Sequence, residues 1–220
     1  MKPINVEHIY RVWFAGVASP IEVRRTTERG YGGIDEETWL PMYHLAATTC
    51  GVGSGSVVLD AGCGSGYGAD HLASIGCKVT AIDVSDEAVR YARLCAPEAS
   101  VLQCTLEQPL VLPVPFDAVV AIESVEHVQN DSAMFAEFHR VLRPGGVLFL
   151  STPDSELFDR AHAEAYPEAP QRAQNPFHVR EYVEADPRAL LEHTGFTHVA
   201  RVRTPQPQYS QALCVVCWKP

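Results

Sequence analysis

The sequence contains no cluster of basic residues, and its 27 aspartates and glutamates outnumber its 17 lysines and arginines to give a formal net charge of -10. A fold with that excess of carboxylates repels a phosphate backbone unless it presents a basic patch, so nucleic acid is not expected as a partner. No window approaches the roughly 20 consecutive apolar residues that cross a bilayer. The apolar stretch at 12–18 is too short for the core of a signal peptide, and we expect no association with a membrane.

The seven cysteines lack the even count and tight spacing of a disulfide framework. We therefore expect reduced thiols in a cytosolic protein. Cys214 and Cys217 have the C-x-x-C spacing of some zinc and redox sites, but no second cysteine pair accompanies them. Because residues three apart on a strand point to opposite faces, both are expected to be core residues.

From about residue 56 the sequence alternates short apolar runs with helical stretches. This alternation predicts an α/β fold, with a parallel sheet covered by helices on both faces. The expected strands are 56–61, 78–82, 100–104, 116–122, 147–151, 197–203 and 212–218. The expected helices are 69–75, 86–95, 133–142 and 184–192, and Ser85 is expected to cap the second of them.

The first expected strand runs directly into a glycine-rich turn, DAGCGSG at 60–66. Glycines allow tight turns and let the backbone approach a ligand without a Cβ in the way. In open α/β sheets, nucleotide-like ligands bind at this place, the carboxyl end of the first strand. Asp83 closes the second expected strand, where an acidic side chain suits two ribose hydroxyls.

A dinucleotide is the competing ligand for this turn, because Gly64-x-Gly66-x-x-Ala69 satisfies the looser dinucleotide-binding pattern. Asp60 argues against it, since its negative charge would repel a pyrophosphate. The same charge would attract the ammonium group of an amino-acid moiety, directly or through water. A nicotinamide-dependent oxidoreductase is thus the alternative to a protein that binds a nucleoside carrying an amino acid.

The DAGCGSG run resembles motif I of the class I S-adenosylmethionine-dependent methyltransferases. Further segments, in the same order along the chain, resemble other motifs of that family: IDVS at 82–85, FDAVV at 116–120, LRPGG at 142–146, NPFHVREY at 175–182 and GF at 195–196. The resemblance covers about residues 25–218 and extends to the ubiquinone-pathway O-methyltransferase-like, or methyltransferase type 11, group. It implies a Rossmann-like, seven-stranded, mostly parallel sheet in the order 3-2-1-4-5-7-6, with strand 7 antiparallel.

S-adenosylmethionine is the cofactor that this resemblance implies, with a methyl group passing to a small-molecule acceptor. In the family pattern the acid and glycines of motif I frame the methionine part of the cofactor, the acid after the second strand holds the ribose, and its neighbour flanks the adenine. After the third strand the family often has an aspartate that meets the adenine amine, and Thr105 and Leu106 stand there instead. Carried over, the pattern assigns cofactor binding to Asp60, Gly62, Cys63, Gly64, Asp83, Val84, Thr105 and Leu106, with Tyr31 closing over the cofactor.

The 220 residues suit one domain with a large core. Within it we expect an N-terminal cap at 1–50, a cofactor-binding core at 51–152, an acceptor-side cover at 153–180 and the C-terminal part of the sheet at 181–220. A monomer or a homodimer is expected.

The fourth expected strand delivers Glu123, Glu126 and His127 to the place where the acceptor would lie. If this segment forms one helical turn, i,i+3 and i,i+4 spacing puts the three side chains on one face. Methyl transfer to a hydroxyl needs a group that removes its proton, and His127, as the base, and Glu123 are the catalytic candidates. Alternatively, Glu123 forms only local hydrogen bonds and His127 alone faces the acceptor. Two close carboxylates are costly unless a proton or a cation lies between them.

The E-x-x-E-H spacing is also similar to the magnesium-binding cluster of ubiquinone-pathway O-methyltransferases and of small-RNA 2′-O-methyltransferases. This second resemblance implies a metal site built from Glu123, Glu126, His127 and His178, with Mg²⁺, Mn²⁺ or Zn²⁺ as the ion. It stands beside the interpretation of His127 as a metal-free base.

O-methylation of a hydroxyl, in secondary metabolism or a quinone-like pathway, is the expected reaction. N-methylation of a small molecule is the nearest alternative. RNA 2′-O-methylation, a nicotinamide-dependent oxidoreductase and a non-catalytic cofactor-binding protein are further ones.

Overall fold

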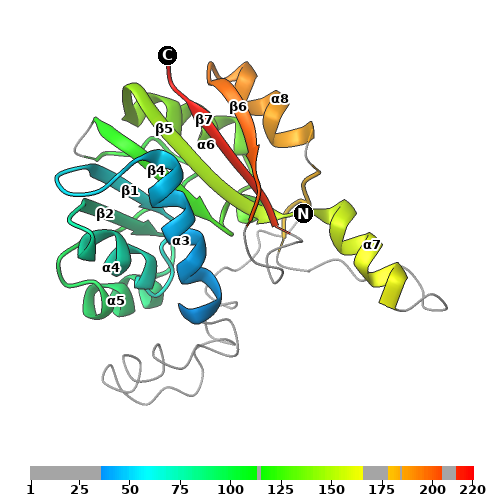
Figure 1. Cartoon of the computed structure of the whole chain (residues 1–220). Helices are drawn as coiled ribbons and strands as arrows, with labels where there is room; N and C mark the ends of the chain where they lie inside the picture. Colours follow the sequence, from blue (N-terminus) through cyan, green and yellow to red (C-terminus); the bar gives the residue numbers. More distant parts are fainter. Residues whose placement is uncertain (1–35, 113–114, 166–177, 184, 205–211) are drawn as a thin grey trace.

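The structure is a computed structural model that describes residues 36–112, 115–165, 178–183, 185–204 and 212–220, and every structural statement below concerns these residues. At its centre lies a seven-stranded sheet in the order β3-β2-β1-β4-β5-β7-β6 (Figure 1). The strands are β1 (Val57–Ala61), β2 (Lys78–Asp83), β3 (Ser100–Gln103), β4 (Phe116–Ile122), β5 (Leu142–Pro153), β6 (Thr197–Val202) and β7 (Ala212–Trp218).

Strands β1 to β5 pair in parallel, whereas β7 runs antiparallel to both β5 and β6. This confirms the expected Rossmann-like order with strand 7 reversed. The two middle strands, β1 and β4, are buried along nearly their whole length, as strands covered on both faces should be. Their carboxyl ends lie side by side because β1 pairs directly with β4.

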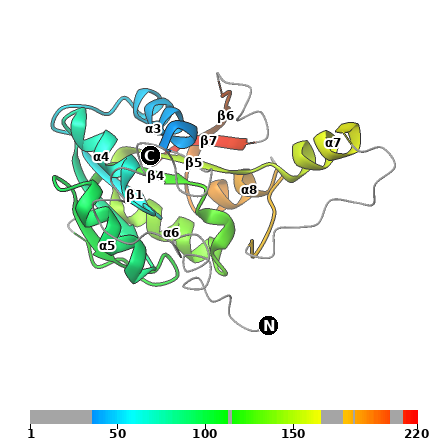
Figure 2. The ribbon, with the colours of Figure 1, turned by 90° about the horizontal axis from the view of Figure 1, so that it is seen from below.

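The described chain also forms six α-helices, most of which pack against the two faces of this sheet. They are α3 (Glu36–Cys50), α4 (Tyr67–Ser74), α5 (Asp86–Cys95), α6 (Asp131–Val141), α7 (Ser155–Ala165) and α8 (Ala185–His193). The core on one face includes Phe135 and Phe138 of α6 and Leu191 of α8. The core on the other includes Met42 of α3 and Leu72 of α4, and Figure 2 shows α3 across the sheet from α6 and α8. None of the helices within the described ranges has the length and apolar character that crossing a membrane requires.

Local sequence explains where two of these helices begin. The Ser85 hydroxyl accepts a hydrogen bond from the backbone N–H of Ala88 at 3.3 Å, which confirms Ser85 as the N-cap of α5. Asn130 caps α6 in the same way, through a bond of 3.1 Å from the N–H of Ala133.

Strand β5 begins earlier than the sequence indicates. Pro144-Gly145-Gly146 predicts a turn before a strand at 147–151, yet the strand starts at Leu142. The extra residues stay in the sheet because Gly145 donates to the carbonyl of Lys219 and Lys219 donates to that of Gly146, both at 2.9 Å. The parallel register to β4 shifts between Phe116 and Ala118, so the turn signal marks an irregularity inside the strand.

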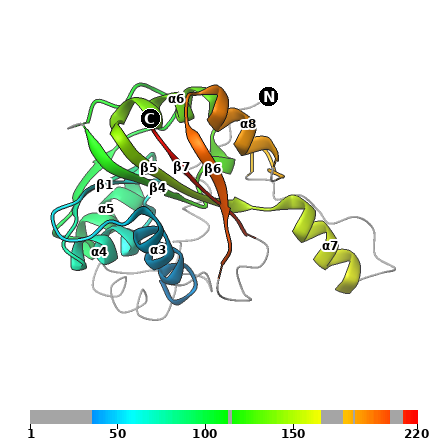
Figure 3. The ribbon, with the colours of Figure 1, turned by 45° about the horizontal axis from the view of Figure 1, so that its top comes forward.

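The expected cover at 153–180 begins with a helix, α7, that was not predicted from the sequence. Helix α7 follows Asp154, whose carboxylate accepts a hydrogen bond of 3.3 Å from the N–H of Leu157. Figures 1 and 3 show α7 extending away from the sheet. Cys214 and Cys217 belong to the cores on opposite faces of the sheet, so the C-x-x-C pair does not form one site.

Candidate active site

The carboxyl ends of β1, β2 and β4 meet at one edge of the sheet, and most of the candidate residues follow them. The turn after β1 is tied to the end of β2, because the N–H groups of Gly62 and Cys63 both donate to the carbonyl of Ile82, at 2.9 and 3.0 Å. The Ser124 hydroxyl, which follows β4, donates to the carbonyl of Ala61 at 2.9 Å. The three strand ends therefore form one connected unit.

Two glycines of the turn differ in what surrounds them. A Cβ at Gly62, where φ is +84°, would lie 2.5 Å from the Cβ of Ser124, so only glycine fits this backbone. A Cβ at Gly64 would meet nothing within 4 Å. The backbone at Gly64 thus has open space beside it, which suits a turn that a ligand approaches closely.

Asp83 lies at the end of β2 and is almost completely buried. Its two carboxylate oxygens accept hydrogen bonds from the backbone N–H groups of Gly64 and Ser85, each at 2.9 Å. These two bonds hold the carboxylate in a fixed orientation at the carboxyl end of β2. Val84 beside it is 44% exposed, an apolar surface at the place expected for the adenine.

Asp60 has no exposed surface at all. One oxygen accepts a hydrogen bond of 3.0 Å from the hydroxyl of Tyr43 in α3, and the other, Oδ2, has no hydrogen-bond partner among the described residues. Burial raises the pKa of Asp60 to about 7; the Tyr43 hydrogen bond lowers it, and the nearby charge of Asp83 raises it. A buried carboxylate with a free oxygen suits a cationic group, and the ammonium of an amino-acid moiety is one.

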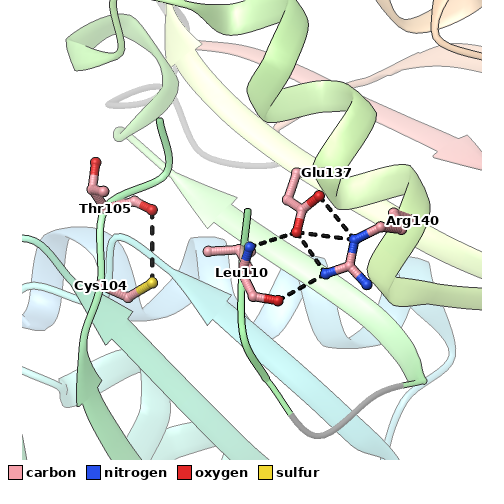
Figure 4. A network of polar contacts seen from close by, with 5 residues as sticks. All are labelled: Cys104, Thr105, Leu110, Glu137 and Arg140. Atoms are coloured by element: carbon pink, nitrogen blue, oxygen red, sulfur yellow. Dashed lines mark hydrogen bonds and ion pairs between the residues drawn. The ribbon is translucent and has the colours of Figure 1, made fainter. Parts of the chain in front are cut away.

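Thr105 and Leu106 lie in the loop that follows β3. The Thr105 hydroxyl accepts a bond of 3.2 Å from the N–H of Glu107, and Leu106 packs against the core on the α6 face. Further along this loop, Leu110 is held by α6, because its N–H donates to Glu137 at 2.5 Å and its carbonyl accepts from Arg140 at 2.7 Å (Figure 4). Tyr31, the remaining cofactor-side candidate, lies outside the described residues.

The segment after β4 forms a short 3₁₀ turn, η1 (Val125–His127), in place of an α-helical turn. Glu123 precedes this turn with φ +49°, and its carboxylate accepts a hydrogen bond of 2.8 Å from the hydroxyl of Ser151. Glu126 is buried and accepts a bond of 3.1 Å from the hydroxyl of Thr152. The side chain of His127 is one-third exposed, and its Nε2 lies 3.9 Å from Oε1 of Glu126.

His178 joins this turn from far along the chain. The rings of His127 and His178 lie edge to face with centroids 5.2 Å apart. One ligand atom from each of Glu126, His127 and His178 lies within 4.8 Å of the others. Glu123 is not part of this set, so the structure gathers three of the four residues proposed as metal ligands.

The strap 178–183 holds His178 in this position. The N–H of Val179 donates to the carbonyl of Glu126 at 2.9 Å. Arg180 forms an ion pair with Asp131, at the start of α6, and donates to the carbonyl of Gln129 at 2.8 Å. The hydroxyl of Tyr182 also donates to Asp131, at 3.1 Å.

Burial raises the pKa of both glutamates, and the charge of Glu126 raises that of Glu123 further. Burial raises the pKa of Glu126 to about 7, against the hydrogen bond from Thr152, which lowers it. Burial and the charge of Glu126 hold the pKa of Glu123 well above its usual range. Two carboxylates in this relation favour a shared proton or a neighbouring cation.

Three residues of this site carry no sequence signal of their own. Tyr43, Asp131 and Arg180 act through contacts between distant parts of the chain. Arg180 belongs to the NPFHVREY run, which marked His178 alone as a candidate.

Comparison with known proteins shows which family the chain resembles. Residues 59–150 match the family described as a methyltransferase domain. A protein of Mycolicibacterium smegmatis named a probable S-adenosylmethionine-dependent methyltransferase is 35% identical over 187 residues, which cover 81% of this chain and 67% of that protein. This chain thus spans about two thirds of the length of that relative.

Two more similar proteins match in sequence or in structure. A ubiquinone biosynthesis O-methyltransferase of Xanthomonas campestris is 42% identical over 103 residues, which cover 44% of this chain and 43% of that protein. The magnesium protoporphyrin IX methyltransferase of Synechocystis, solved with bound S-adenosylhomocysteine, superposes with a TM-score of 0.66. That match covers 97% of this chain and 99% of the other at 20% identity, so it shows a shared fold.

Proposed function

Because this chain belongs to the S-adenosylmethionine-dependent methyltransferases, we propose that it transfers the cofactor's methyl group to a hydroxyl oxygen of a small-molecule acceptor. The observation that carries the proposal is the convergence of Glu126, His127 and His178, whose ligand atoms lie within 4.8 Å of one another. A hydroxyl is a weak nucleophile until it loses its proton, and this set can remove it. The similarity to a ubiquinone biosynthesis O-methyltransferase supports oxygen as the acceptor atom.

In this reaction the acceptor oxygen bonds to the methyl carbon as the carbon–sulfur bond breaks, and the sulfonium becomes a neutral thioether. The protein aligns the two partners and accepts the hydroxyl proton. His127 is suited to accept it, because its side chain is partly exposed while Glu126 beside it is buried. The carboxylate of Glu126 would stabilise the imidazolium that forms, because a negative charge at short distance favours the protonated form of histidine.

The cofactor side of the proposal assigns a role to each residue of the connected strand ends. Asp83 would accept hydrogen bonds from the ribose, and the open side of Gly64 would admit the methionine part. Asp60 would meet the ammonium group. Val84 would lie against the adenine, with Thr105 and Leu106 on the other loop that borders it.

The same three side chains also fit a divalent metal ion. Glu126, His127 and His178 would hold it, and a bound ion would lower the pKa of the acceptor hydroxyl. Because Glu123 lies outside the set, two imidazoles and one carboxylate remain. That donor set suits Mn²⁺ or Zn²⁺ better than Mg²⁺, which prefers oxygen ligands.

The experiment compares a panel of phenols with the matching anilines, with formation of S-adenosylhomocysteine as the readout. We expect turnover of phenols, and turnover of anilines alone would refute an oxygen acceptor.

His127→Ala should lower turnover by at least about a hundred-fold while the affinity for S-adenosylhomocysteine stays nearly unchanged. If activity is unchanged in the presence of a chelator, His127 removes the hydroxyl proton without a metal ion. If the chelator abolishes activity and Mn²⁺ or Zn²⁺ restores it, a bound metal ion takes part.

A further inference from the structure

We propose that Tyr43 is a positioning residue for cofactor binding: its hydroxyl fixes the carboxylate of Asp60 so that the second oxygen of Asp60 receives the ammonium group of the cofactor. The inference rests on the role proposed above for Asp60, and it adds to the site a residue from α3, a helix that precedes every motif of the chain.

The position of the Tyr43 ring leaves it little freedom. The residue is 2% exposed, and its ring lies edge to face with that of Tyr67, with centroids 5.7 Å apart. It also fills the space over Gly68 in α4, where an added Cβ would come within 2.0 Å of the ring. A side chain packed on these sides holds its hydroxyl at one place, 3.0 Å from Oδ1 of Asp60.

Asp60 is chemically incomplete without a further donor. Its carboxylate is fully buried, and Tyr43 satisfies only one of the two oxygens within the part of the chain that the structure describes. A buried charged oxygen without a hydrogen bond is costly, and an incoming ammonium group would remove that cost. Binding energy of this kind depends on the orientation of the carboxylate, which the Tyr43 hydroxyl sets.

The groups around Asp60 make this contact sensitive to pH. Tyr43 faces it from α3, Asp83 lies at the end of β2, and Cys63 follows it in the turn. None of these three groups is a cation. Because no positive charge among them offsets the effect of burial, the pKa of Asp60 is raised to about 7, and only the Tyr43 hydrogen bond lowers it. His44, next to Tyr43 in α3, pairs instead with His71 of α4, at a centroid distance of 6.0 Å.

The sign of the pH effect follows from this. An ammonium group prefers the ionised form of Asp60, so cofactor affinity should rise with pH through the pKa of the free protein and level off above it. Tyr43→Phe removes a hydrogen bond that favours the ionised form, so it should move this midpoint to higher pH. A merely structural role for Tyr43 would lower affinity equally at every pH.

The test is calorimetry of S-adenosylhomocysteine binding between about pH 5.5 and about pH 8.5, with the ligand's own titration common to all variants. We expect Tyr43→Phe to lower affinity at every pH, because the Asp60 carboxylate is no longer oriented, and to lower it most near pH 7, because the midpoint moves to higher pH. Asp60→Asn should bind weakly and lose the pH dependence. The matched control is Tyr182→Phe, which removes a similar tyrosine–aspartate hydrogen bond of 3.1 Å to Asp131 and should leave the midpoint unchanged.

An unchanged midpoint in Tyr43→Phe, or an equal loss of affinity at all pH values, would overturn the proposal. Should Tyr43→Phe fail to fold, carbon NMR of the wild-type protein tests the Asp60 contact on which the positioning role of Tyr43 depends. The Asp60 carboxyl should titrate near neutrality in the free protein and at clearly lower pH in the complex, and an identical titration in both would refute the contact. No acceptor is present in these measurements, so their outcome is independent of whether oxygen is the methylated atom.

Discussion

Ser124 lies so close to Gly62 that a Cβ at position 62 would come within 2.5 Å of the Cβ of Ser124. Gly62 belongs to the turn after β1, and Ser124 precedes the 3₁₀ turn that contains Glu126 and His127. The Ser124 hydroxyl also donates to the carbonyl of Ala61. The loop proposed to bind the cofactor and the loop proposed to act on the acceptor are therefore in direct contact.

Gly62→Ala should consequently disturb both loops. We expect it to lower the free energy of unfolding by about 1–3 kcal/mol, the usual cost of forcing an extra methyl into a packed site, and to weaken S-adenosylhomocysteine binding by at least about ten-fold. Urea unfolding and calorimetry measure the two effects. Gly53→Ala is the matched control, because φ at Gly53 is not positive and a Cβ there meets nothing within 4 Å. Wild-type affinity in Gly62→Ala would contradict the contact.

Arg180→Met should lower turnover through His178. Without the ion pair to Asp131, the strap 178–183 loses its strongest anchor, and we expect turnover to fall about ten-fold with S-adenosylhomocysteine affinity preserved. The double variant Asp131→Asn with Arg180→Met no longer leaves a buried charge unpaired, so it should regain stability while turnover stays low. Arg188→Met, which removes only the exposed Arg188–Glu192 pair, should have no effect. Full activity in Arg180→Met would show that the ion pair does not position His178.

Glu137→Ala should weaken cofactor binding through the loop that follows β3. Its carboxylate accepts from the N–H of Leu110 and binds Arg140, which in turn holds the Leu110 carbonyl. Release of this loop would loosen Thr105 and Leu106, so we expect a several-fold loss of S-adenosylhomocysteine affinity, larger than that of Glu192→Ala at an exposed site. Equal affinities in the two variants would show that the loop containing Thr105 and Leu106 does not contribute to cofactor binding.

Asp117→Asn should destabilise the protein in a way that depends on pH. The backbone N–H of Val57 and the guanidinium of Arg143 donate to Asp117 at 2.7 and 2.6 Å, and both lower its pKa. A carboxylate with a lowered pKa stabilises the fold above its unfolded-state pKa, and this contribution is lost as pH falls through the folded-state value.

We therefore expect Asp117→Asn to cost about 1 kcal/mol at pH 7 and for the difference from wild type to shrink below about pH 4. Urea unfolding at several pH values measures this. The exposed Glu192→Gln exchange provides the baseline. If the difference in the free energy of unfolding between wild type and Asp117→Asn stayed constant down to the lowest pH at which the protein folds, the charge of Asp117 would not be its cause.

Much of the fold could be predicted from the sequence because most of the central strands, such as β1 and β4, are short apolar runs bounded by a turn or a helix. The order of the sheet came with the family resemblance, and the antiparallel β7 pairs as expected. Helix α7 was missed because its sequence, SELFDRAHAEA, lies in a Pro-, Ala- and acid-rich stretch that looks like a connection. The start of β5 was misplaced because Gly145 and Gly146, a turn signal in isolation, pair with Lys219 at the chain's end.

The site residues, too, fall into those that could be predicted from the sequence and those that could not. Residues that follow strand ends, such as Asp83 and His127, could be placed from topology, since parallel strands deliver their ends to one edge. Tyr43 and Arg180 could not, because their partners are 17 and 49 positions away and no spacing links them. Glu123 was grouped with Glu126 on the assumption of a helical turn, but the 3₁₀ turn begins two residues later, at Val125, and leaves Glu123 bonded to Ser151.

The chain leaves the sheet at Asp154 and returns at Tyr182, where these two residues form a bridge beside β5. The N–H of Ser155 also donates to the carbonyl of Tyr182 at 3.0 Å, so the excursion opens and closes at a single narrow neck. Lengthening a loop whose ends are already joined costs little conformational entropy. Helix α7 lies just beyond this neck, so we expect insertions or deletions within α7 to leave the register of the seven-stranded sheet and the anchoring of the strap 178–183 unchanged.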